Sequence, residues 1–401
     1  MKPTRHALII GAGIAGPVIA MFLHKAGISS AIYEARTSAE GVGSFLQIAP
    51  NGMNVLKVIG LDTKISSAGT VASHIRFRNS HGKSLCRITN GSLEAHGAPA
   101  VLILRPALHR ILMTEAVERG IPVSLGKRLV RIVDQPGQPV VAHFEDGSSA
   151  EGDIIIGADG IWSAVRRLVM PEAPNPVYTG LIGVGGLAPL HDFPGMMLTN
   201  EPEMTMTWGP RGFFGYGVGR VGQEKSMLWW SNQPQDAPPT REELKSAPQE
   251  DLRRDLIATH GDWHTPIRQL IEQTDEVLRI AIYEMPSLST WHRGRAVLIG
   301  DAAHAMATSA GQGASQALED TIALAKLLRD EPGPMQNAFP AFEEQRRPRA
   351  EKVSAISRRN SERKKTLGPF AERMRDFFVA HVLPVVARRS WNAMYAYKVD
   401  W

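Results

Sequence analysis

The chain has 401 residues, of which 43% are hydrophobic and 21% are charged, as in an ordinary globular protein. This composition excludes collagen-like, disordered and coiled-coil proteins. The net charge of +5 favours anionic ligands, but the basic residues are spread too widely to indicate nucleic-acid binding. The single cysteine, Cys86, excludes an intramolecular disulfide, and the histidines show no metal-binding spacing. We therefore expect a cytoplasmic protein that binds neither a metal ion nor nucleic acid.

The N-terminal segment has some features of a signal peptide. Lys2 and Arg5 precede an uncharged apolar stretch at residues 7–22, but this stretch contains glycines and a proline and is followed by His24. It is also shorter than the roughly 20 residues that a membrane span requires, and no later segment is long and apolar enough. We therefore expect neither export nor a membrane span.

The first 35 residues alternate between strand and helix. Residues 6–10 are typical of a buried parallel strand, and Gly11-Ala-Gly-Ile-Ala-Gly16 leads from them into a helical pattern that ends near Gly27. Glycines in such a turn let backbone N–H groups approach a pyrophosphate at the start of the helix. Residues 30–34 predict the next strand, which ends at Glu34. A carboxylate there accepts hydrogen bonds from ribose hydroxyls and repels a 2′-phosphate, which favours FAD or NAD over NADP.

The chain between residues 41 and 175 mixes strands and helices. The expected elements are a loop feeding a helix, a group of strands, a helix and a hairpin, at residues 41–60, 73–100, 104–118 and 140–156 respectively. Asp159 then follows an apolar strand, beside Gly157 and Gly160. Because ligands bind at the carboxyl ends of strands in an open parallel sheet, Asp159 is a candidate binding residue.

The region between residues 180 and 282 is rich in glycine, tryptophan and methionine. It has strand-like segments followed by a helical pattern, at residues 204–208, 213–218, 227–230 and 242–271. Aromatic residues among glycines are as consistent with a sheet core as with the wall of a pocket for a flat apolar ligand. The candidate pocket residues are Phe213, Tyr216 and Trp230.

From residue 295 the pattern of the N-terminal region returns. Residues 296–299 predict a buried strand that ends at Gly300-Asp301, and residues 314–328 predict a long helix. The turn Gly311-Gln312-Gly313 begins this helix, whose free N–H groups can face an electron-rich ring or an anion. His304 is expected to cap a helix or support the site rather than act as a base. The basic run from Arg346 onward is interrupted by glutamates, which is typical of a solvated helix face.

Taken together, these segments resemble the single-component FAD-dependent aromatic hydroxylases, the group A monooxygenases of the p-hydroxybenzoate hydroxylase type. The resemblance rests on the first glycine motif, Asp159-Gly160, Gly300-Asp301, the strand Phe213–Tyr216 and Gln345-Arg-Arg-Pro-Arg349. It implies an α/β fold with a Rossmann-type FAD-binding domain, an inserted mixed β-sheet substrate domain and a C-terminal helix. The implied boundaries are 1–72, 101–175 and 283–345 for the FAD-binding domain, 73–100 and 176–282 for the substrate-binding domain, and 346–401 for the C-terminal helical segment.

The resemblance also implies a set of cofactor contacts. Those to the FAD pyrophosphate and adenosine come from Gly11, Gly13, Ile14, Ala15, Gly16, Glu34, Ala35, Arg36 and Leu129. Those nearer the flavin come from Arg105, Asp159, Asp301, Gly311, Gln312, Gly313 and Ala314, and Asp159 would also meet the nicotinamide donor. Thr308 stands where relatives usually have the proline beside the substrate, and Ser315 where they often have asparagine. The resemblance therefore does not determine which residues form the substrate pocket.

The implied reaction uses NADPH or NADH and dioxygen to hydroxylate an aromatic or polycyclic small molecule through a flavin hydroperoxide. Because the flavin carries this chemistry, no catalytic side chain is assigned. Two alternatives stay open: an NAD-linked dehydrogenase that uses only the first glycine motif, and a non-catalytic accessory protein with a flavin fold. The chain is expected to be a monomer or a homodimer.

Overall fold

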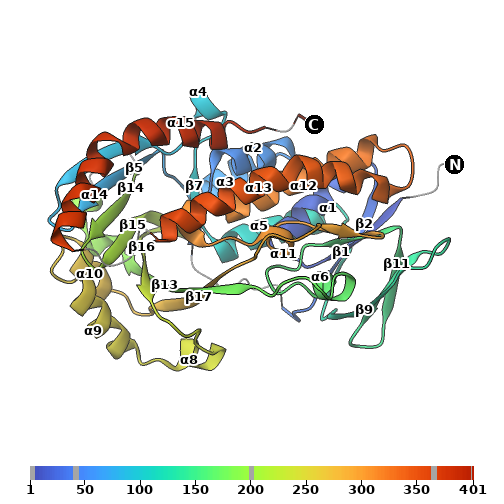
Figure 1. Ribbon diagram of the computed structural model, residues 1–401, viewed down its shortest axis with the longest axis horizontal. Helices are drawn as coiled ribbons and strands as arrows, with labels where there is room; N and C mark the ends of the chain where they lie inside the picture. The colour runs from blue at the N-terminus through green and yellow to red at the C-terminus, as the bar shows by residue number, and fades with distance from the viewer. Residues whose placement is uncertain (1–4, 39–44, 198–202, 363–367, 399) are drawn as a thin grey trace.

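The computed structural model describes residues 5–38, 45–197, 203–362, 368–398 and 400–401. Figure 1 shows a parallel sheet on one side of the molecule, near β1 (His6–Ile10), and a mixed sheet on the other, near β15 (Gly212–Val221). The long helix α13 (Phe339–Glu362) runs between the two sides. The fold is therefore a mixed α/β arrangement, as the sequence predicts.

The parallel sheet has the order β18-β19-β12-β1-β2-β8, and only β18 runs antiparallel to its neighbour. The bounds of its other strands, in that order, are His292–Arg293, Ala296–Leu298, Ile154–Gly157, Ser29–Glu34 and Val123–Leu125. Leu8 of the central strand lies opposite Ala31 on one side and Ile155 on the other. Such nearly continuous apolar runs are typical of parallel strands buried on both faces.

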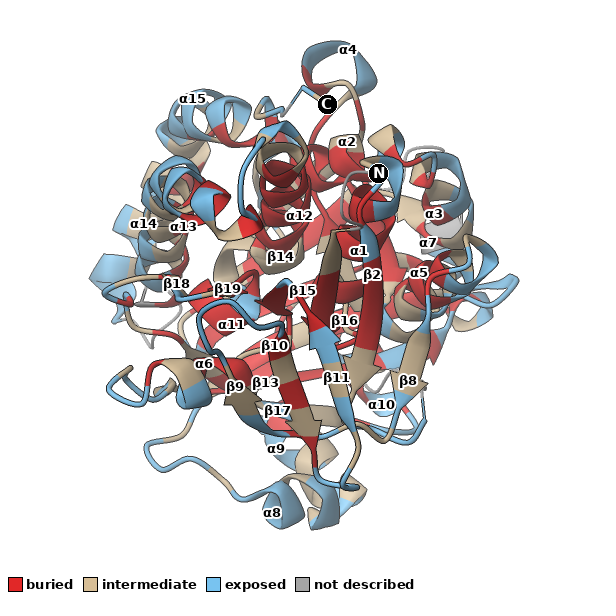
Figure 2. Ribbon diagram, turned by 90° about the vertical axis from the view of Figure 1, so that its right-hand side faces the viewer, coloured by how far each residue is buried: buried red, intermediate tan, exposed pale blue. Residues whose placement is uncertain are grey.

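Helices cover the parallel sheet and complete the main hydrophobic core. They include α1 (Ala15–Lys25), α5 (Arg105–Glu118) and α12 (Gly313–Asp330), and α1 packs against both of the others. Figure 2 shows α12 as mostly buried. Because α12 is buried on nearly all sides, its polar residues need partners inside the protein.

The mixed sheet has the order β17-β13-β16-β15-β14-β5-β6. The bounds of its other strands, in that order, are Leu278–Glu284, Val177–Pro189, Glu224–Pro234, Glu203–Gly209, His74–Asn79 and Ser84–Thr89. One face packs against α9 (Gln249–His260) and α10 (Ile267–Glu272). The other face meets β7 (Val101–Leu104) and is covered at its β6 edge by α14 (Pro369–His381) and α15 (Leu383–Tyr395).

Two small sheets and several short helices complete the described part of the chain. The small sheets are β3-β7-β4 and β11-β10-β9, whose further strands are Phe45–Ile48, Thr70–Val71, Ser149–Gly152, Val140–Phe144 and Leu129–Val133. The remaining α-helices, α2, α3, α4, α6, α7, α8 and α11, span Pro50–Val58, Asp62–Ala68, Leu93–His96, Ala164–Val169, Pro194–Met197, Arg241–Ser246 and Asp301–His304. The 3-10 helices η1, η2 and η3 span Leu190–Asp192, Thr308–Ala310 and Met335–Ala338.

Two sequence predictions of local structure are wrong. The expected hairpin at residues 140–156 ends early: β10 pairs with β11, and the next residues form β12 in the parallel sheet. Asp153 marks the change of sheet, because its Oδ2 accepts a hydrogen bond from the backbone N–H of His6 at 2.7 Å. The helical pattern at residues 242–271 is divided into α8, α9 and α10, with Pro248 and Pro266 at the starts of the last two helices.

The C-terminal segment packs against the rest of the chain. Tyr395 is buried, and the ring of Trp401 lies 5.1 Å from that of Phe22. Within the described residues, none of the helices combines the length and the apolar character that crossing a bilayer requires.

Candidate cofactor and substrate site

The carboxyl ends of neighbouring parallel strands bring the predicted binding residues to one edge of the sheet. The backbone N–H of Ala158 donates to the carbonyl of Ile10 at 2.8 Å, and that of Ile299 donates to the carbonyl of Gly157 at 3.0 Å. The glycine turn, Asp159 and Asp301 therefore follow three adjacent strands, β1, β12 and β19. In an open α/β sheet this edge is where ligands bind.

The three motif glycines meet different surroundings. Gly11 has a φ of +105°, and a Cβ there would lie 2.5 Å from the carbonyl oxygen of Ala158. A Cβ on Gly16 would lie 2.0 Å from the carbonyl oxygen of Gly11, whereas one on Gly13 would have no atom within 4 Å. Gly11 and Gly16 are thus required by packing within the protein, and Gly13 faces open space. No side chain caps the start of α1 at Ile14, which leaves N–H groups available to an anion.

Glu34 lies beside this turn because β2 pairs with β1. Its Oε2 accepts a hydrogen bond from the backbone N–H of Ala12 at 2.8 Å, and its Oε1 accepts one from that of Arg36 at 2.9 Å. Ala35 is half-buried, and the Arg36 side chain is exposed. The backbone N–H of Lys127 donates to the carbonyl of Glu34 at 2.7 Å, so the chain leading to Leu129 runs beside β2. Leu129 itself is buried in the main core.

Only one carboxylate oxygen of Asp159 accepts hydrogen bonds from described residues. Oδ2 accepts hydrogen bonds from the backbone N–H groups of Ala164 at 2.7 Å and Val165 at 3.1 Å, which fixes the side chain at the start of α6. Oδ1 is buried and has no hydrogen-bond partner among the described residues. Burial raises the pKa of Asp159, although hydrogen bonds from Ser163 and the backbone oppose the shift. A buried, unpartnered oxygen at this edge fits a ligand that donates a hydrogen bond.

The start of α12 offers a second unpartnered polar atom. The side-chain Oε1 of Gln312 accepts a hydrogen bond from Asn51 Nδ2 at 3.0 Å, but its buried Nε2 has no partner among the described residues. Gly311 has a φ of +60°, and no side chain caps this helix. Ser315 Oγ accepts a hydrogen bond from the backbone N–H of Ala49 at 3.0 Å, which joins the start of α2 to α12. Ser315 thus has a defined role in the packing of this chain.

Arg105 and Asp301 are both exposed at helix starts. Arg105 begins α5, and one turn later His109 Nε2 contacts the carbonyl oxygen of Ala12 at 2.6 Å, so this end of α5 abuts the glycine turn. Asp301 begins α11 and makes no hydrogen bond or ion pair with other described residues. Both side chains are therefore available to a ligand. Gly313 and Ala314 are half-buried at the start of α12.

The mixed sheet brings together only part of the predicted substrate wall. The rings of Phe213 and Trp230 lie 6.3 Å apart, and Phe45 of β3 lies 5.1 Å from Trp230. Tyr216, expected in the same pocket, is on the opposite face, because it pairs across the strands with Trp229 while Trp230 pairs with Gly215. This part of the prediction is wrong. Thr308 is exposed in η2, on the segment that leads into α12.

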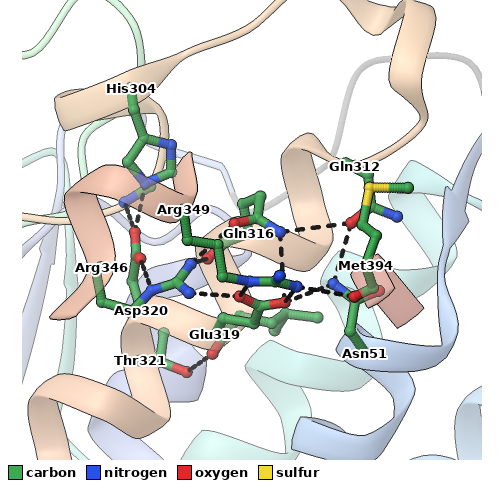
Figure 3. Close-up of polar contacts among 12 residues, drawn as sticks. Asn51, His304, Gln312, Gln316, Glu319, Asp320, Thr321, Arg346, Arg349 and Met394 are labelled. Carbon is green, nitrogen blue, oxygen red and sulfur yellow. Dashed lines mark hydrogen bonds and ion pairs between the residues drawn. The ribbon is translucent and has the colours of Figure 1, made fainter. Parts of the chain in front are cut away.

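A buried ionic network holds α12 against α13 and α11 (Figure 3). Asp320 Oδ2 accepts hydrogen bonds from the backbone N–H of Gly300 at 2.8 Å and from His304 Nε2 at 2.6 Å. Asp320 Oδ1 accepts one from Arg346 Nε at 2.8 Å, and Arg346 also pairs with Glu319. Burial by itself would raise the pKa of Asp320, but His304 and Arg346 lower it overall. Asp320 therefore carries a negative charge that fixes the Gly300-Asp301 turn.

The expectation of a solvated basic helix face is wrong for two arginines. Arg346 is fully buried, and Arg349 Nε donates to the buried carboxylate of Glu319 at 2.7 Å. The guanidinium of Arg349 also lies 4.0 Å from the ring centre of Tyr397. Arg346 and Arg349 face inward because α13 packs against α12. Their carboxylate partners, Glu319 and Asp320, lie on α12.

A second polar chain connects the C-terminal helix to the flavin-facing turn expected from the sequence. The hydroxyl of Tyr395 donates to Asn90 Oδ1 at 3.0 Å, and Asn90 Nδ2 donates to Gln47 Oε1 at 2.9 Å. Gln47 Nε2 lies 3.6 Å from the position that a Cβ on Gly311 would take. The sequence analysis missed all three residues, because they are far apart in the chain and belong to no motif.

Comparison with known proteins identifies the family. A protein-family model described as "FAD binding domain" matches residues 4–357. The chain belongs to this FAD-binding family. Similar family relatives include 3-amino-4-hydroxybenzoate 2-monooxygenase from Streptomyces cremeus, which is 32% identical over 88% of this chain and 86% of that protein. Another, 6-hydroxynicotinate 3-monooxygenase from Pseudomonas fluorescens, is 29% identical over 90% of this chain and 92% of that protein.

The FAD-binding family fold is also found among solved structures. The crystal structure of Klebsiella pneumoniae HpxO complexed with FAD and uric acid has a TM-score of 0.79 and 24% sequence identity, and the match covers 100% of this chain and 94% of that one. This likeness confirms the predicted Rossmann-type α/β fold. The relatives confirm the resemblance to FAD-dependent aromatic hydroxylases.

Proposed function

We propose that this chain is an FAD-dependent monooxygenase that uses NADH or NADPH and dioxygen to hydroxylate an aromatic small molecule. The observation that carries the proposal is a pair of buried polar atoms, Asp159 Oδ1 and Gln312 Nε2, that lack partners among the described residues. Both belong to residues that the family resemblance places beside FAD. The names of the family relatives, which are aromatic monooxygenases, support the reaction type.

The residues at the sheet edge fit FAD. The uncapped start of α1, with open space at Gly13, would hold the pyrophosphate, and Glu34 would bind the adenosine ribose. Asp301 would bind the ribityl or diphosphate region. The remaining contacts would come from Gly11, Ile14, Ala15, Gly16, Ala35, Arg36, Arg105, Leu129, Gly311, Gln312, Gly313 and Ala314.

When bound, FAD supplies the two-electron chemistry that activates dioxygen. The protein's part is to orient and shield it. The start of α12 would stabilise negative charge near its first N–H groups, and Gln312 Nε2, which has no partner among the described residues, would donate a hydrogen bond to the cofactor in the same place. Phe213 and Trp230 of the mixed sheet, together with Phe45 of β3, form an apolar wall that excludes water from an aromatic substrate. We therefore assign the mixed sheet, residues 73–100 and 176–282, to substrate binding.

A purification experiment tests the cofactor and the reaction separately. The native protein is expected to be yellow and to release FAD on denaturation. A panel of aromatic carboxylates, hydroxypyridines, purines and polycyclic phenols is then screened for oxidation of NADH or NADPH, dioxygen consumption and a product heavier by one oxygen atom. A colourless protein that does not take up FAD would contradict the proposal.

The two alternatives give different results in the same assays. An NAD-linked dehydrogenase would reduce NAD without consuming dioxygen, and it would leave Asp159 and Asp301 without a role. A flavin-binding accessory protein would hold FAD, yet no compound in the panel would accelerate oxidation of NADH or NADPH. Either outcome would replace the proposed reaction.

A further inference from the structure

The two C-terminal helices, α14 and α15, have an inner face that is packed and an outer face that is not. Val379 and Ala387 are buried in the core that these helices share with β5, β6 and β14. On the outer face, Phe370 is 79% exposed and Phe377 is 60% exposed. The other exposed apolar residues of this face are Met374, Val382, Val385 and Val386. We call these residues the outer apolar face.

The spacing of these residues gathers them around the junction of the two helices. Phe370, Met374 and Phe377 recur at intervals of four and three residues, so they share one side of α14. Val382, Val385 and Val386 lie at the start of α15, directly after α14 ends at His381. Figure 1 shows both helices at the outer edge of the molecule. Exposed apolar residues scattered singly are common, but a group of this kind indicates an interaction surface.

The charges on α14 and α15 are unbalanced. The two carboxylates of α14, Glu372 and Asp376, both bond to Arg375 of the same helix. Arg373, Arg388 and Arg389 are exposed, and none has a hydrogen-bond or ion-pair partner within the described ranges. Because α15 contains no acidic residue, the unpaired charge beside the outer apolar face is positive.

We propose that the outer apolar face binds the surface of an anionic lipid bilayer. Apolar side chains flanked by arginines match both the acyl chains and the phosphates of such a surface. A symmetric dimer through the same face would instead bring Arg373, Arg388 and Arg389 of both copies together, where like charges repel. The family match ends at residue 357, so the surface lies beyond that part of the chain. Binding would be interfacial, with both helices lying on the bilayer.

Co-sedimentation with vesicles tests this proposal on the full chain. Vesicles of equal parts phosphatidylglycerol and phosphatidylcholine are expected to bind the protein, and vesicles of phosphatidylcholine alone to bind much less. Raising the salt from 0.1 M to 1 M shortens the Debye length from about 10 Å to about 3 Å and is expected to release much of the bound protein. Equal binding to both vesicles would contradict the proposal, as would no binding to the anionic vesicles.

Two pairs of variants locate the binding surface. Phe370→Ser with Phe377→Ser is expected to weaken partitioning by at least about tenfold, because each buried phenyl ring contributes strongly to binding. Arg388→Gln with Arg389→Gln is expected to weaken it by about fivefold per arginine removed. The matched controls are Val117→Ser with Val130→Ser, which are exposed on α5 and β9, and Arg241→Gln with Lys245→Gln on α8. Retained binding in the first two pairs would overturn the assignment.

A measurement of mass in solution separates lipid binding from dimerisation. Light scattering on the vesicle-free protein is expected to give the same mass for the wild type and for Phe370→Ser with Phe377→Ser. A dimer mass in the wild type that this variant loses would show that the face joins two copies, and it would overturn the proposal. Circular dichroism confirms that each variant is folded. None of these measurements depends on FAD or on the proposed reaction.

Discussion

Gly13 and Gly16 belong to one motif, but the structure gives them different roles. A methyl group on Gly16 would overlap the carbonyl oxygen of Gly11, whereas one on Gly13 would project into open space. The motif therefore combines a residue that packing requires with a residue that leaves room for a ligand. Only the tertiary structure distinguishes these two roles, because both residues are glycine in the sequence.

We predict that Gly13→Ala and Gly16→Ala differ in what they damage. Gly16→Ala is expected to lower the free energy of unfolding by about 1–3 kcal/mol, because the backbone must shift to admit the methyl group. Gly13→Ala is expected to leave that free energy nearly unchanged and to weaken FAD binding by roughly tenfold or more, because the methyl group occupies the pyrophosphate's space. Urea denaturation of the FAD-free protein and FAD titration measure the two effects. If Gly13→Ala binds FAD normally, the pyrophosphate lies elsewhere.

His260 is a buried titratable residue under the mixed sheet. Only 1% of it is exposed, and its Nε2 lies 3.1 Å from Ser231 Oγ. Burial lowers the pKa of His260 to about 4, and the nearby charge of Arg211 adds to the shift. Because the unfolded chain binds the proton more tightly, the stability from the neutral ring is complete above about pH 6.5 and declines as the pH falls toward 4.

We predict that His260→Gln makes the protein less sensitive to acid. Between about pH 7 and pH 4, the wild type is expected to lose about 3 kcal/mol more of its free energy of unfolding than the variant, because only the wild type gains this proton on unfolding. Urea denaturation at a series of pH values measures the difference. His264→Gln serves as a comparison, because burial also lowers the pKa of His264. Parallel curves for the wild type and His260→Gln would contradict the assignment.

At the scale of elements, α12 is fixed between α11 and α13 by buried charges. Arg346 bridges Glu319 and Asp320, and Asp320 in turn holds the backbone of Gly300 and the ring of His304. The helix whose start faces the proposed flavin site is therefore positioned by ionic contacts along its length. A buried pair of this kind is costly to break from one side, because the remaining charge stays buried without a partner.

We predict a large difference between two neighbouring arginines of α13. Arg346→Ala is expected to lower the free energy of unfolding by about 3–5 kcal/mol, because it removes the fully buried cation that pairs with both carboxylates and leaves only Arg349 on Glu319 and His304 on Asp320. Arg347→Ala removes partly exposed pairs with Glu343 and Glu351 and is expected to cost about 1 kcal/mol or less. Thermal and urea unfolding of the two variants provide the comparison. Similar losses would show that burial of the network contributes little.

At the scale of the whole molecule, the proposed FAD contacts come from segments that are distant in sequence. They include the starts of α1, α5 and α12 and the ends of β12 and β19, which meet only in the folded chain. A ligand held by all of them binds the native state and not the unfolded chain. It therefore stabilises the native state by mass action.

We predict that FAD raises the unfolding temperature. FAD at about 100 times its dissociation constant is expected to add about 2.7 kcal/mol to the free energy of unfolding. Asp301→Asn is expected to reduce this gain, because it removes a charge proposed to meet the cofactor, without disturbing buried contacts. Asp330→Asn is the matched control, because Asp330 lies at the end of α12 opposite to the proposed FAD contacts. An unfolding temperature that does not respond to FAD would contradict the proposed site.

The sequence by itself determined many of the local elements and the edge of the sheet where a nucleotide is expected. Apolar runs, helical spacing and glycines act over a few residues, so β1, α1, β19 and α12 follow closely from their own segments. Tertiary structure decided the features that depend on contacts between distant segments of the chain. It placed Tyr216 on the opposite face from Trp230, buried Arg346 against Asp320, and joined Tyr395 to Gln47 through Asn90. These outcomes depend on strand register and helix packing between distant segments, and local periodicity carries no information about either.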